Sequence, residues 1–178
     1  VNSLEKSAAD QMGKEAAVFV PSGTMGNLIS MLSHCNRGDE VFLGDQSHIF
    51  LNEVGGIAAL GGIHPHTISN ESDGTLNLET LEKKRRASDL HYPPTRLIAL
   101  ENTHNYCMGS PIQPGYMQQV GDLAKRYNLQ IHVDGARIFN AAIALEVDAK
   151  DLVREADSVM FCLSKGLSAP VGSLVCGN

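Results

Sequence analysis

One lysine and one aspartate have residue types and positions that catalysis could use. Lys165 follows the apolar run at residues 159–163, and Asp134 closes the apolar run at residues 129–133. Burying an unpaired ammonium costs free energy, so a lysine beside a buried strand needs a partner charge or a chemical task. A desolvated lysine forms a Schiff base with a carbonyl group, and a nearby aspartate can keep a pyridine nitrogen protonated. The pair therefore indicates pyridoxal 5'-phosphate chemistry, the alternative being a lysine whose ammonium reaches water beyond the strand end.

A short turn between an apolar run and a helical pattern could hold a phosphate. It consists of Ser22, Gly23 and Thr24, whose N–H groups and hydroxyls could surround an anion where the helix dipole favours negative charge. A plain helix cap is the alternative, because Ser and Thr are ordinary N-cap residues. The turn matches neither a P-loop nor the dinucleotide-binding fingerprint, so no motif supports nucleotide binding.

Two histidines lie where an imidazole could act on a substrate. His48 precedes Glu53 by five positions, and its ring could stack on a planar cofactor or serve as a base. The alternative is a histidine near a helix start with no special partner. His104 lies in a loop after an apolar strand, next to amides and a carboxylate, so it could handle a proton or orient a substrate. Hydrogen bonding within the loop is the alternative for His104.

Other basic side chains allow more than one interpretation. Arg137 comes three residues after Asp134, so its guanidinium could bind a substrate carboxylate through two hydrogen bonds or pair with Asp134. His64 and His66 share one strand face at a spacing that is compatible with a metal. No third ligand stands at a fixed spacing from them, so a structural role is favoured and no metal site is predicted. The basic run at residues 83–86 is expected to be a solvated helix face.

Strands and helices are expected to alternate along the chain. Apolar runs bounded by turn residues predict strands at residues 16–20, 40–43, 63–68, 96–100, 129–133, 159–163 and 171–176, the last able to run antiparallel. Helical spacing predicts helices at residues 3–12, 24–34, 47–54, 78–86 and 116–127. This alternation predicts an α/β fold of three layers, a mostly parallel sheet with helices on both faces. Ligands bind beyond the carboxyl ends of such strands, where Lys165, Asp134 and His104 are expected together with the turn described above.

Composition describes an ordinary globular chain. Of the 178 residues 43% are hydrophobic and 19% charged, and the prior for this length is one domain. A net charge of -6 argues against nucleic-acid and anionic-membrane binding, and no apolar stretch is long enough for a bilayer span. The four cysteines form no C-x-x-C motif, which favours reduced core residues over disulfides or zinc. We expect a cytoplasmic protein, with a mitochondrial address left open because the sequence does not start with methionine.

Six short motifs carry a resemblance to a known enzyme family. They are Ser22-Gly23-Thr24-Met25-Gly26-Asn27-Leu28, Ser47-His48-Ile49, Glu53 with Gly55-Gly56, Glu101-Asn102-Thr103-His104-Asn105, His132-Val133-Asp134-Gly135-Ala136-Arg137 and Cys162-Leu163-Ser164-Lys165-Gly166-Leu167. In this order and combination they resemble the low-specificity L-threonine aldolases, which are fold-type I pyridoxal phosphate enzymes with an aspartate-aminotransferase-like large domain. The resemblance extends over almost the whole chain.

The resemblance implies a role for each polar residue at the expected site. It implies catalytic roles for Lys165, His48, His104 and Asp134. It implies cofactor contacts for Gly23, Thr24, His48, Asp134, Arg137, Ser164 and Lys165. On this basis Lys165 is the Schiff-base lysine, Asp134 is the partner of the pyridine nitrogen, and His48 stacks on the ring. The turn and Ser164 contact the phosphate, Arg137 lies near the phenolic oxygen and the substrate carboxylate, and both histidines face the substrate's β-hydroxyl.

The implied reaction is the retro-aldol cleavage of L-threonine or L-allo-threonine to glycine and acetaldehyde. A base takes the proton of the β-hydroxyl, and His48, His104 or a water between them are the alternatives for that base. The resemblance also implies an amino-acid substrate and a homodimer or homotetramer with shared active sites. A related pyridoxal phosphate β-eliminating lyase and a non-catalytic truncated remnant are the alternative functions.

The chain departs from the family in length and in two loops. Family members are about twice as long, so residues 1–178 are expected to form a single cofactor-binding large domain without the family's N-terminal segment and C-terminal small domain. That small domain carries an arginine for the substrate carboxylate, so we expect the isolated chain to lack robust aldolase activity. Residues 106–111 replace a Gly-Gly-Arg-like stretch of the family, and Ser168 stands where glycine is common.

Overall fold

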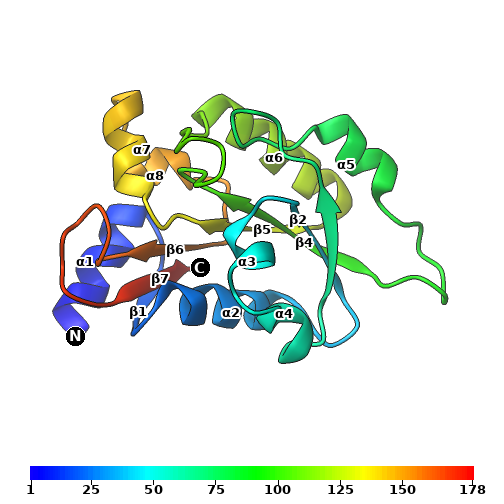
Figure 1. Ribbon diagram of the computed structural model, residues 1–178, viewed down its shortest axis with the longest axis horizontal. Coiled ribbons are helices and arrows are strands. Elements are labelled where there is room, and N and C mark those ends of the chain that lie inside the picture. Colours follow the sequence, from blue (N-terminus) through cyan, green and yellow to red (C-terminus); the bar gives the residue numbers. More distant parts are fainter.

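Seven strands form one sheet with helices on both faces in the computed structural model, which describes residues 1–178 (Figure 1). The strands are β1 (Ala16–Val20), β2 (Glu40–Gly44), β3 (His64–Ile68), β4 (Thr95–Glu101), β5 (Gln130–Asp134), β6 (Ser158–Cys162) and β7 (Ser173–Gly177). The helices are α1 (Asn2–Met12), α2 (Gly23–His34), α3 (His48–Leu51), α4 (Gly56–Ala59), α5 (Leu78–Lys84), α6 (Pro114–Tyr127), α7 (Ile138–Leu145) and α8 (Ala149–Leu152). None of these helices is both long and apolar enough to span a bilayer.

The order of strands across the sheet is β1-β7-β6-β5-β4-β2-β3. The five strands from β6 to β3 in this order pair in parallel, whereas β7 runs antiparallel to both β1 and β6. The predicted α/β fold, mostly parallel with an antiparallel last strand, is confirmed. The carboxyl ends of the central strands are in register, because Glu101 pairs with Asp134 and Asp134 pairs with Met160.

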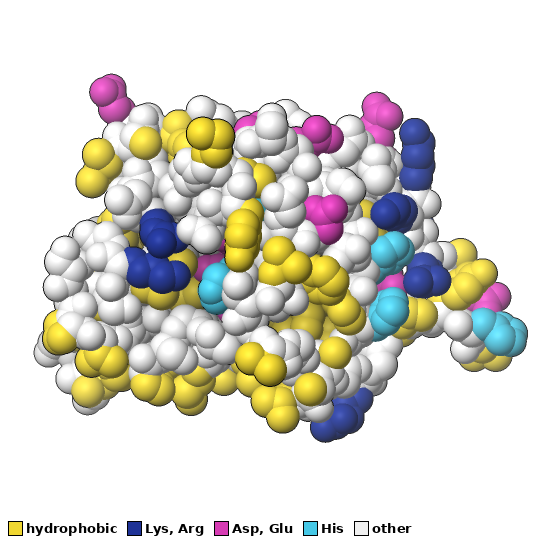
Figure 2. All heavy atoms as spheres, in the orientation of Figure 1, with side chains coloured by type: hydrophobic (Ala, Val, Ile, Leu, Met, Phe, Trp, Pro, Cys, Tyr) yellow, Lys and Arg dark blue, Asp and Glu magenta, His cyan; other side chains and the backbone are white.

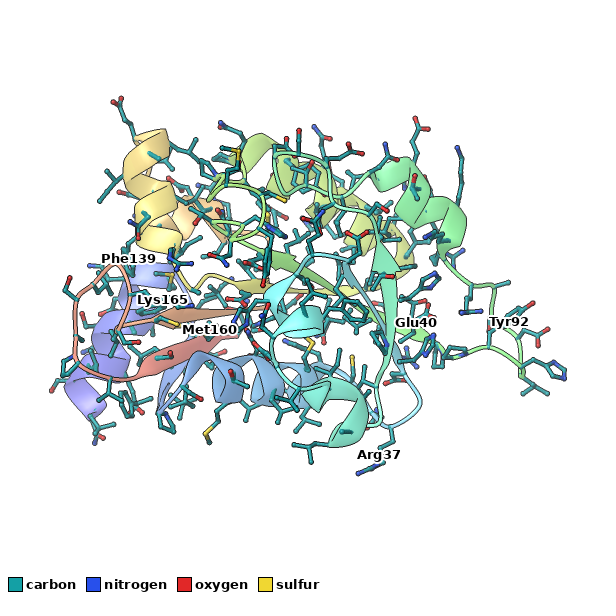
Figure 3. All side chains as sticks on the ribbon, viewed as in Figure 1. Arg37, Glu40, Tyr92, Phe139, Met160 and Lys165 are labelled. Atoms are coloured by element: carbon teal, nitrogen blue, oxygen red, sulfur yellow. The ribbon has the colours of Figure 1, made fainter.

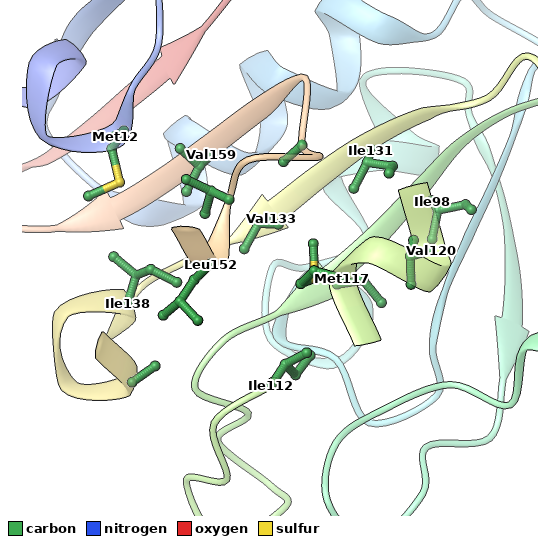
Figure 4. Close-up of a cluster of buried hydrophobic side chains, with 14 of the residues drawn as sticks. Met12, Ile98, Ile112, Met117, Val120, Ile131, Val133, Ile138, Leu152 and Val159 are labelled. Carbon is green, nitrogen blue, oxygen red and sulfur yellow. The ribbon is translucent and has the colours of Figure 1, made fainter. Parts of the chain in front are cut away.

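The core lies in two layers because side chains on a strand alternate between the two faces of the sheet. On β4, Ile98 and Leu100 belong to a cluster of 27 buried residues, which packs against α6, α7 and α8 (Figure 4). Leu97 and Ala99 belong to a second cluster of 9 buried residues, on the side of α2 and α4. The three predicted layers are therefore present.

A close approach of α2 to the sheet positions the site. Ser22 caps this helix, since its Oγ accepts a hydrogen bond from Met25 N at 3.2 Å. One turn later comes Gly26, at which a Cβ atom would lie only 2.6 Å from Met160 Cγ on β6. The absence of a side chain lets the helix backbone lie directly on the strand. The next residue, Asn27, is fully buried over the centre of the sheet.

Several predicted elements differ from the observed ones. The helix expected at residues 47–54 is the single turn α3, because Asn52 leaves helical geometry and Val54 has a left-handed φ of 56°. The last strand begins at Ser173 rather than residue 171, after Gly172 turns the chain with a φ of 103°. The helices α4, α7 and α8 were not predicted. Residues 138–145 are almost all apolar, so their sequence shows no helical period.

The end of the basic run at residues 83–86 is not the solvated helix face that the sequence predicts. Arg86 lies beyond α5, and its Nε donates a hydrogen bond to Glu40 Oε2 at 2.8 Å. His66 Nδ1 lies 3.1 Å from Glu40 Oε1, and His64 Nε2 lies 3.8 Å from Glu40 Oε2. Glu40 is fully buried at the amino end of β2 (Figure 3). The arginine and both histidines therefore surround a buried carboxylate, far along the strands from their carboxyl ends.

Candidate active site at the carboxyl ends of the central strands

Two adjoining cavities lie at the carboxyl ends of β4, β5 and β6. The first has a volume of about 200 Å³ and is lined by His48, Glu101, Asn105, Asp134, Ala136, Arg137 and Lys165. The second has a volume of about 320 Å³ and is lined in part by Ser22, Gly23, Thr24, His48, Ser164, Lys165 and Gly172. Since His48 and Lys165 line both, the cavities form one site. Figure 2 shows basic, acidic and histidine side chains gathered in a hollow in the region where Figure 3 labels Lys165.

Asp134 ends β5 and exposes only 2% of its surface. Its Oδ2 accepts a hydrogen bond from Asn27 Nδ2 at 2.8 Å, and its Oδ1 accepts one from Ala136 N at 3.2 Å. Burial raises the pKa of the Asp134 carboxyl, while the hydrogen bond from Asn27 opposes that rise. No basic side chain of the chain forms an ion pair with it. An ionised Asp134 would therefore be stabilised by a cation that enters the cavity.

His48 is held from two sides at the start of α3. Its Nδ1 lies 2.9 Å from Glu53 Oε1, and its backbone N–H donates to Glu101 Oε2 at 2.7 Å. The hydrogen bond to Glu53 raises the pKa of the His48 imidazole. Glu53 also accepts a hydrogen bond from Asn27 Nδ2 at 2.7 Å. His48 thus has the special partner that the sequence left open, and its ring lines the cavity with the other nitrogen unengaged.

Arg137 and Lys165 both face the cavity without an acidic partner. Arg137 Nη1 donates to Asn105 Oδ1 at 3.2 Å and makes no ion pair with Asp134, so the alternative that these two residues pair is wrong. Lys165 is exposed in the turn that follows β6, so the desolvated ammonium that the sequence indicates is not observed. The reason is that β6 ends at Cys162, so Ser164 and Lys165, two and three residues later, lie in the turn that lines the cavity.

The turn at the start of α2 serves as a helix cap and also lines the second cavity. Because the first N–H groups of a helix have no acceptor within it, those of Gly23 and Thr24 remain available to an anion. Ser164 and Gly172 also line this cavity. Ser168, in this loop, has a left-handed φ of 59°, a conformation that glycine adopts without strain.

His104 lies behind the cavity rather than in its lining. It is 1% exposed, packed beneath the turn at Gly74, and neither ring nitrogen has a hydrogen-bond partner. Its Nε2 lies 4.0 Å from Glu101 Oε2. Burial lowers the pKa of the His104 imidazole, which favours the neutral ring. Hydrogen bonding within the loop, the alternative role considered for His104, is not observed for its ring.

The sequence assigned no role to three polar residues that complete the site. Glu101 lines the cavity and accepts hydrogen bonds from the backbone N–H groups of His48 and Asn105. Burial and the neighbouring charge of Asp134 raise its pKa. Glu53 and Asn27 lie beneath the cavity. Glu53 binds His48 and Asn27 donates to Asp134, so the hydrogen bond between Asn27 and Glu53 connects these two cavity-lining residues. All three occur within the motifs that carry the family resemblance, which is the signal that could have identified them.

Ligand atoms of His48, Glu53 and Asp134 lie within 4.8 Å of one another, a spacing that a metal ion could use. The same atoms already have hydrogen-bond partners. Asn27 Nδ2 donates to both carboxylates, and Glu53 also binds His48. An ion would have to displace the amide from between the two carboxylates. The hydrogen-bonded arrangement therefore favours an organic ligand above the cluster over a metal within it.

Comparisons with known proteins identify relatives of this chain. The chain is 55% identical over 178 residues to the low-specificity L-threonine aldolase 1 of Arabidopsis thaliana, which covers 98% of this chain and 50% of the relative. It is 46% identical to the low specificity L-threonine aldolase of Escherichia coli K12, covering 100% of this chain and 53% of the relative. The chain thus spans about half the length of the curated relatives that it matches.

The fold also matches solved structures. The threonine aldolase of Leishmania major superposes on 95% of this chain and 49% of its own, with a TM-score of 0.78 and 21% sequence identity. All 178 residues match one protein-family model, which is described as beta-eliminating lyase. The resemblance that the motifs predict is confirmed, and the chain belongs to the beta-eliminating lyase family.

Proposed function

We propose that this chain binds pyridoxal 5'-phosphate and that the whole enzyme cleaves L-threonine and L-allo-threonine to glycine and acetaldehyde. The observation that carries the proposal is the buried Asp134 carboxylate, which has no cationic partner in the chain and faces the same cavity as the free amine of Lys165. The names of the relatives supply the substrate class. When bound, pyridoxal phosphate would supply an electron sink for the negative charge left at the substrate's Cα when a bond there breaks.

The residues present fit such a cofactor in kind. Lys165 offers an uncommitted amine, which can bond to the cofactor's aldehyde carbon. Asp134 would hold the proton of the pyridine nitrogen, since the buried carboxylate gains the cation that it lacks. The free N–H groups of Gly23 and Thr24, with Ser164 in the lining of the same cavity, would hold the phosphate.

Substrate orientation and proton transfer fall to two further side chains. Arg137 would bind the substrate carboxylate, because its guanidinium lines the cavity and engages only the Asn105 amide. His48 would stack on the ring, and its free nitrogen is the favoured acceptor of the β-hydroxyl proton, directly or through a water. Glu53 would then stabilise the imidazolium that forms. His104 is a poorer candidate for this base because its ring lies outside the cavity lining.

The chain is proposed to be the large, cofactor-binding domain of this enzyme. The carboxylate-binding arginine of a small domain and an N-terminal segment would complete the substrate site. We also propose a homodimer or homotetramer. Figure 2 shows apolar side chains next to the hollow, and the exposed apolar side chains of α3 and the residues after it are Phe50, Leu51 and Val54. An apolar surface beside the site fits a second subunit that covers it.

Exchange of the glycine Cα proton with deuterium tests this proposal within the chain itself, because glycine needs no β-hydroxyl base. We expect the protein with pyridoxal phosphate to exchange this proton well above the rate of free cofactor. Lys165→Ala should abolish the excess rate, and Lys150→Ala, at an exposed lysine of α8, should not. Undiminished exchange by Lys165→Ala would contradict the proposal. Acetaldehyde release from threonine is expected to be weak in the isolated chain, and robust release would refute the need for further domains.

A further inference from the structure

A continuous chain of hydrogen bonds runs from the surface through the sheet to the Asp134 carboxylate. His34 Nε2 lies 2.7 Å from Ser158 Oγ, and Ser158 Oγ lies 2.8 Å from His132 Nδ1. His132 Nε2 lies 3.1 Å from Asn27 Oδ1, and Asn27 Nδ2 lies 2.8 Å from Asp134 Oδ2. Every member except His34 is buried. These hydrogen bonds connect segments that are more than one hundred residues apart in sequence.

Strand geometry explains why these residues meet. His132 and Asp134 are two residues apart on β5, so they point to the same face of the sheet. Ser158 is the register partner of His132 on β6. The helix α2 lies across this face (Figure 1) and brings Asn27 over β5. The neighbours Ile131 and Val133 point to the opposite face, into the larger apolar cluster.

The hydrogen bonds at the Asp134 end of this series determine which atoms donate and which accept at Asn27 and His132. Asn27 Nδ2 lies between two carboxylates, 2.7 Å from Glu53 and 2.8 Å from Asp134, so both of its N–H groups are used. Its Oδ1 must then accept, and His132 Nε2 must carry the proton. Burial lowers the pKa of His132 to about 3, so its ring is neutral and Nδ1 accepts from the Ser158 hydroxyl.

We propose that His132 and Asn27 are positioning residues for Asp134, and that the Ser158 hydroxyl, by donating to Nδ1, reinforces the Nε2–H tautomer of His132 that Asn27 requires. The inference rests on the proposed function, because its consequence is a carboxylate held in the orientation that a pyridine nitrogen needs. A buried polar cluster with only a structural role could end anywhere in the core. This one ends on Asp134, which lines the cavity, and on Glu53, which binds the cavity-lining His48, and Asn27 is the side-chain donor to both.

The first measurement needs no cofactor. Nitrogen-15 NMR of the histidine rings should show His132 as the neutral Nε2–H tautomer at neutral pH. Ser158→Ala should weaken this preference, because the donor to Nδ1 is lost while Asn27 Oδ1 still accepts from Nε2–H, and Ser158→Thr should restore it by keeping a hydroxyl. An Nδ1–H tautomer in the unmodified protein would overturn the proposal, as would a ratio of the two tautomers that Ser158→Ala leaves unchanged.

The second measurement is the dissociation constant of pyridoxal phosphate, followed by the absorbance of its lysine adduct. Asn27→Leu should weaken binding roughly tenfold or more, the loss expected for a hydrogen bond to a buried charged group. Ser158→Ala should weaken it less, and Ser158→Thr should restore it. The matched control is Ser30→Ala, which removes a buried hydroxyl from α2 that bonds only to the Gly26 carbonyl.

The outcomes separate this inference from the proposed function. Cofactor binding by the unmodified protein that Asn27→Leu and Ser158→Ala leave unchanged would defeat the inference alone. No binding by the unmodified protein would defeat the proposed function and the inference with it. Thermal unfolding of each variant identifies any that fail to fold, and Ser158→Ala, the smallest change in the set, keeps the comparison decisive if Asn27→Leu is one of them.

Discussion

We expect the Asp134 carboxylate to lower the stability of the protein without a ligand, because it is buried without a cationic partner in the chain. It is nearly fully buried, and burial raises the pKa of its carboxyl. Two hydrogen-bond donors, Asn27 and the Ala136 backbone, only partly replace the water that the carboxylate has lost. Binding sites commonly contain such groups, whose cost is recovered when the ligand arrives.

We predict that Asp134→Asn stabilises the protein without cofactor. A carboxyl whose pKa is raised by folding binds its proton more tightly when folded, so stability declines as pH rises above about 4, the unfolded pKa of aspartate. The amide removes this penalty, and its single oxygen can still accept from Asn27, while the longer hydrogen bond from Ala136 N is lost. The free energy of unfolding in urea at pH 7 should rise by roughly 1 to 2 kcal/mol.

The control for Asp134→Asn is Asp122→Asn, at an exposed position of α6. That variant should unfold with the same free energy as the unmodified protein. The advantage of Asp134→Asn should also shrink toward low pH, where the aspartate is protonated. An asparagine variant that is less stable than the unmodified protein at pH 7 would show that the carboxylate contributes to the fold.

At the scale of single residues, the sequence predicts strand-end positions well and contacts between distant segments poorly. Asp134 and Lys165 lie at the carboxyl edge where the apolar runs predict them. The contact between Asn27 and Asp134, 107 positions apart, depends on the closeness of α2 to the sheet, which no local pattern encodes. The burial of His104 depends in the same way on the turn at Gly74.

At the scale of elements, β2 is anchored at its amino end by charge and at its centre by apolar packing. Glu40 opens the strand and is fully buried, with Arg86 and Thr95 as hydrogen-bond donors. Burial pushes the pKa of Glu40 upward, but the hydrogen bonds, led by that from Arg86, outweigh it and hold the pKa below its usual value. This carboxylate therefore connects β2 to the segment after α5 and to the start of β4.

We predict that Glu40→Gln removes an acid-sensitive part of the protein's stability. A carboxyl whose pKa is lowered by folding contributes stability above the unfolded pKa, about 4.3 for glutamate, and this contribution is lost as pH falls below it. The variant should lose roughly 1 to 3 kcal/mol of unfolding free energy at pH 7, because Arg86 is left without its charged partner.

Urea unfolding from pH 3 to pH 7 measures both effects of the Glu40 substitution. The difference between Glu40→Gln and the unmodified protein should narrow as pH falls toward 3. Glu79→Gln, which changes an exposed glutamate paired with Lys83, is the control and should follow the unmodified protein throughout. A difference that is constant over the whole pH range would show that the carboxylate charge does not carry the effect.

Helices whose apolar residues recur at helical spacing could be predicted from the sequence, and helices without such a spacing could not. The helix α6 has apolar residues on one face and starts at Pro114, so its pattern predicts it. The helix α7 is nearly all apolar. One face packs on the sheet, and its exposed face also carries an apolar residue, Ile143. A short apolar run of this kind does not distinguish helix from strand or loop.

At the scale of the whole molecule, the sheet brings one set of chemical groups to a single edge. The free amine of Lys165, the buried carboxylate of Asp134 and the imidazole of His48 line one cavity, although they come from different parts of the chain. The chain spans about half the length of its curated relatives. We therefore propose that this chain supplies the cofactor-binding part of the enzyme.

Covalent trapping of the cofactor tests the central claim most directly. The protein is incubated with pyridoxal phosphate, reduced with borohydride and mapped by peptide mass spectrometry. Our account predicts one dominant adduct, on Lys165, that is lost in Lys165→Ala and retained in Lys150→Ala. Labelling spread evenly over the exposed lysines, or the absence of any adduct on Lys165, would contradict it.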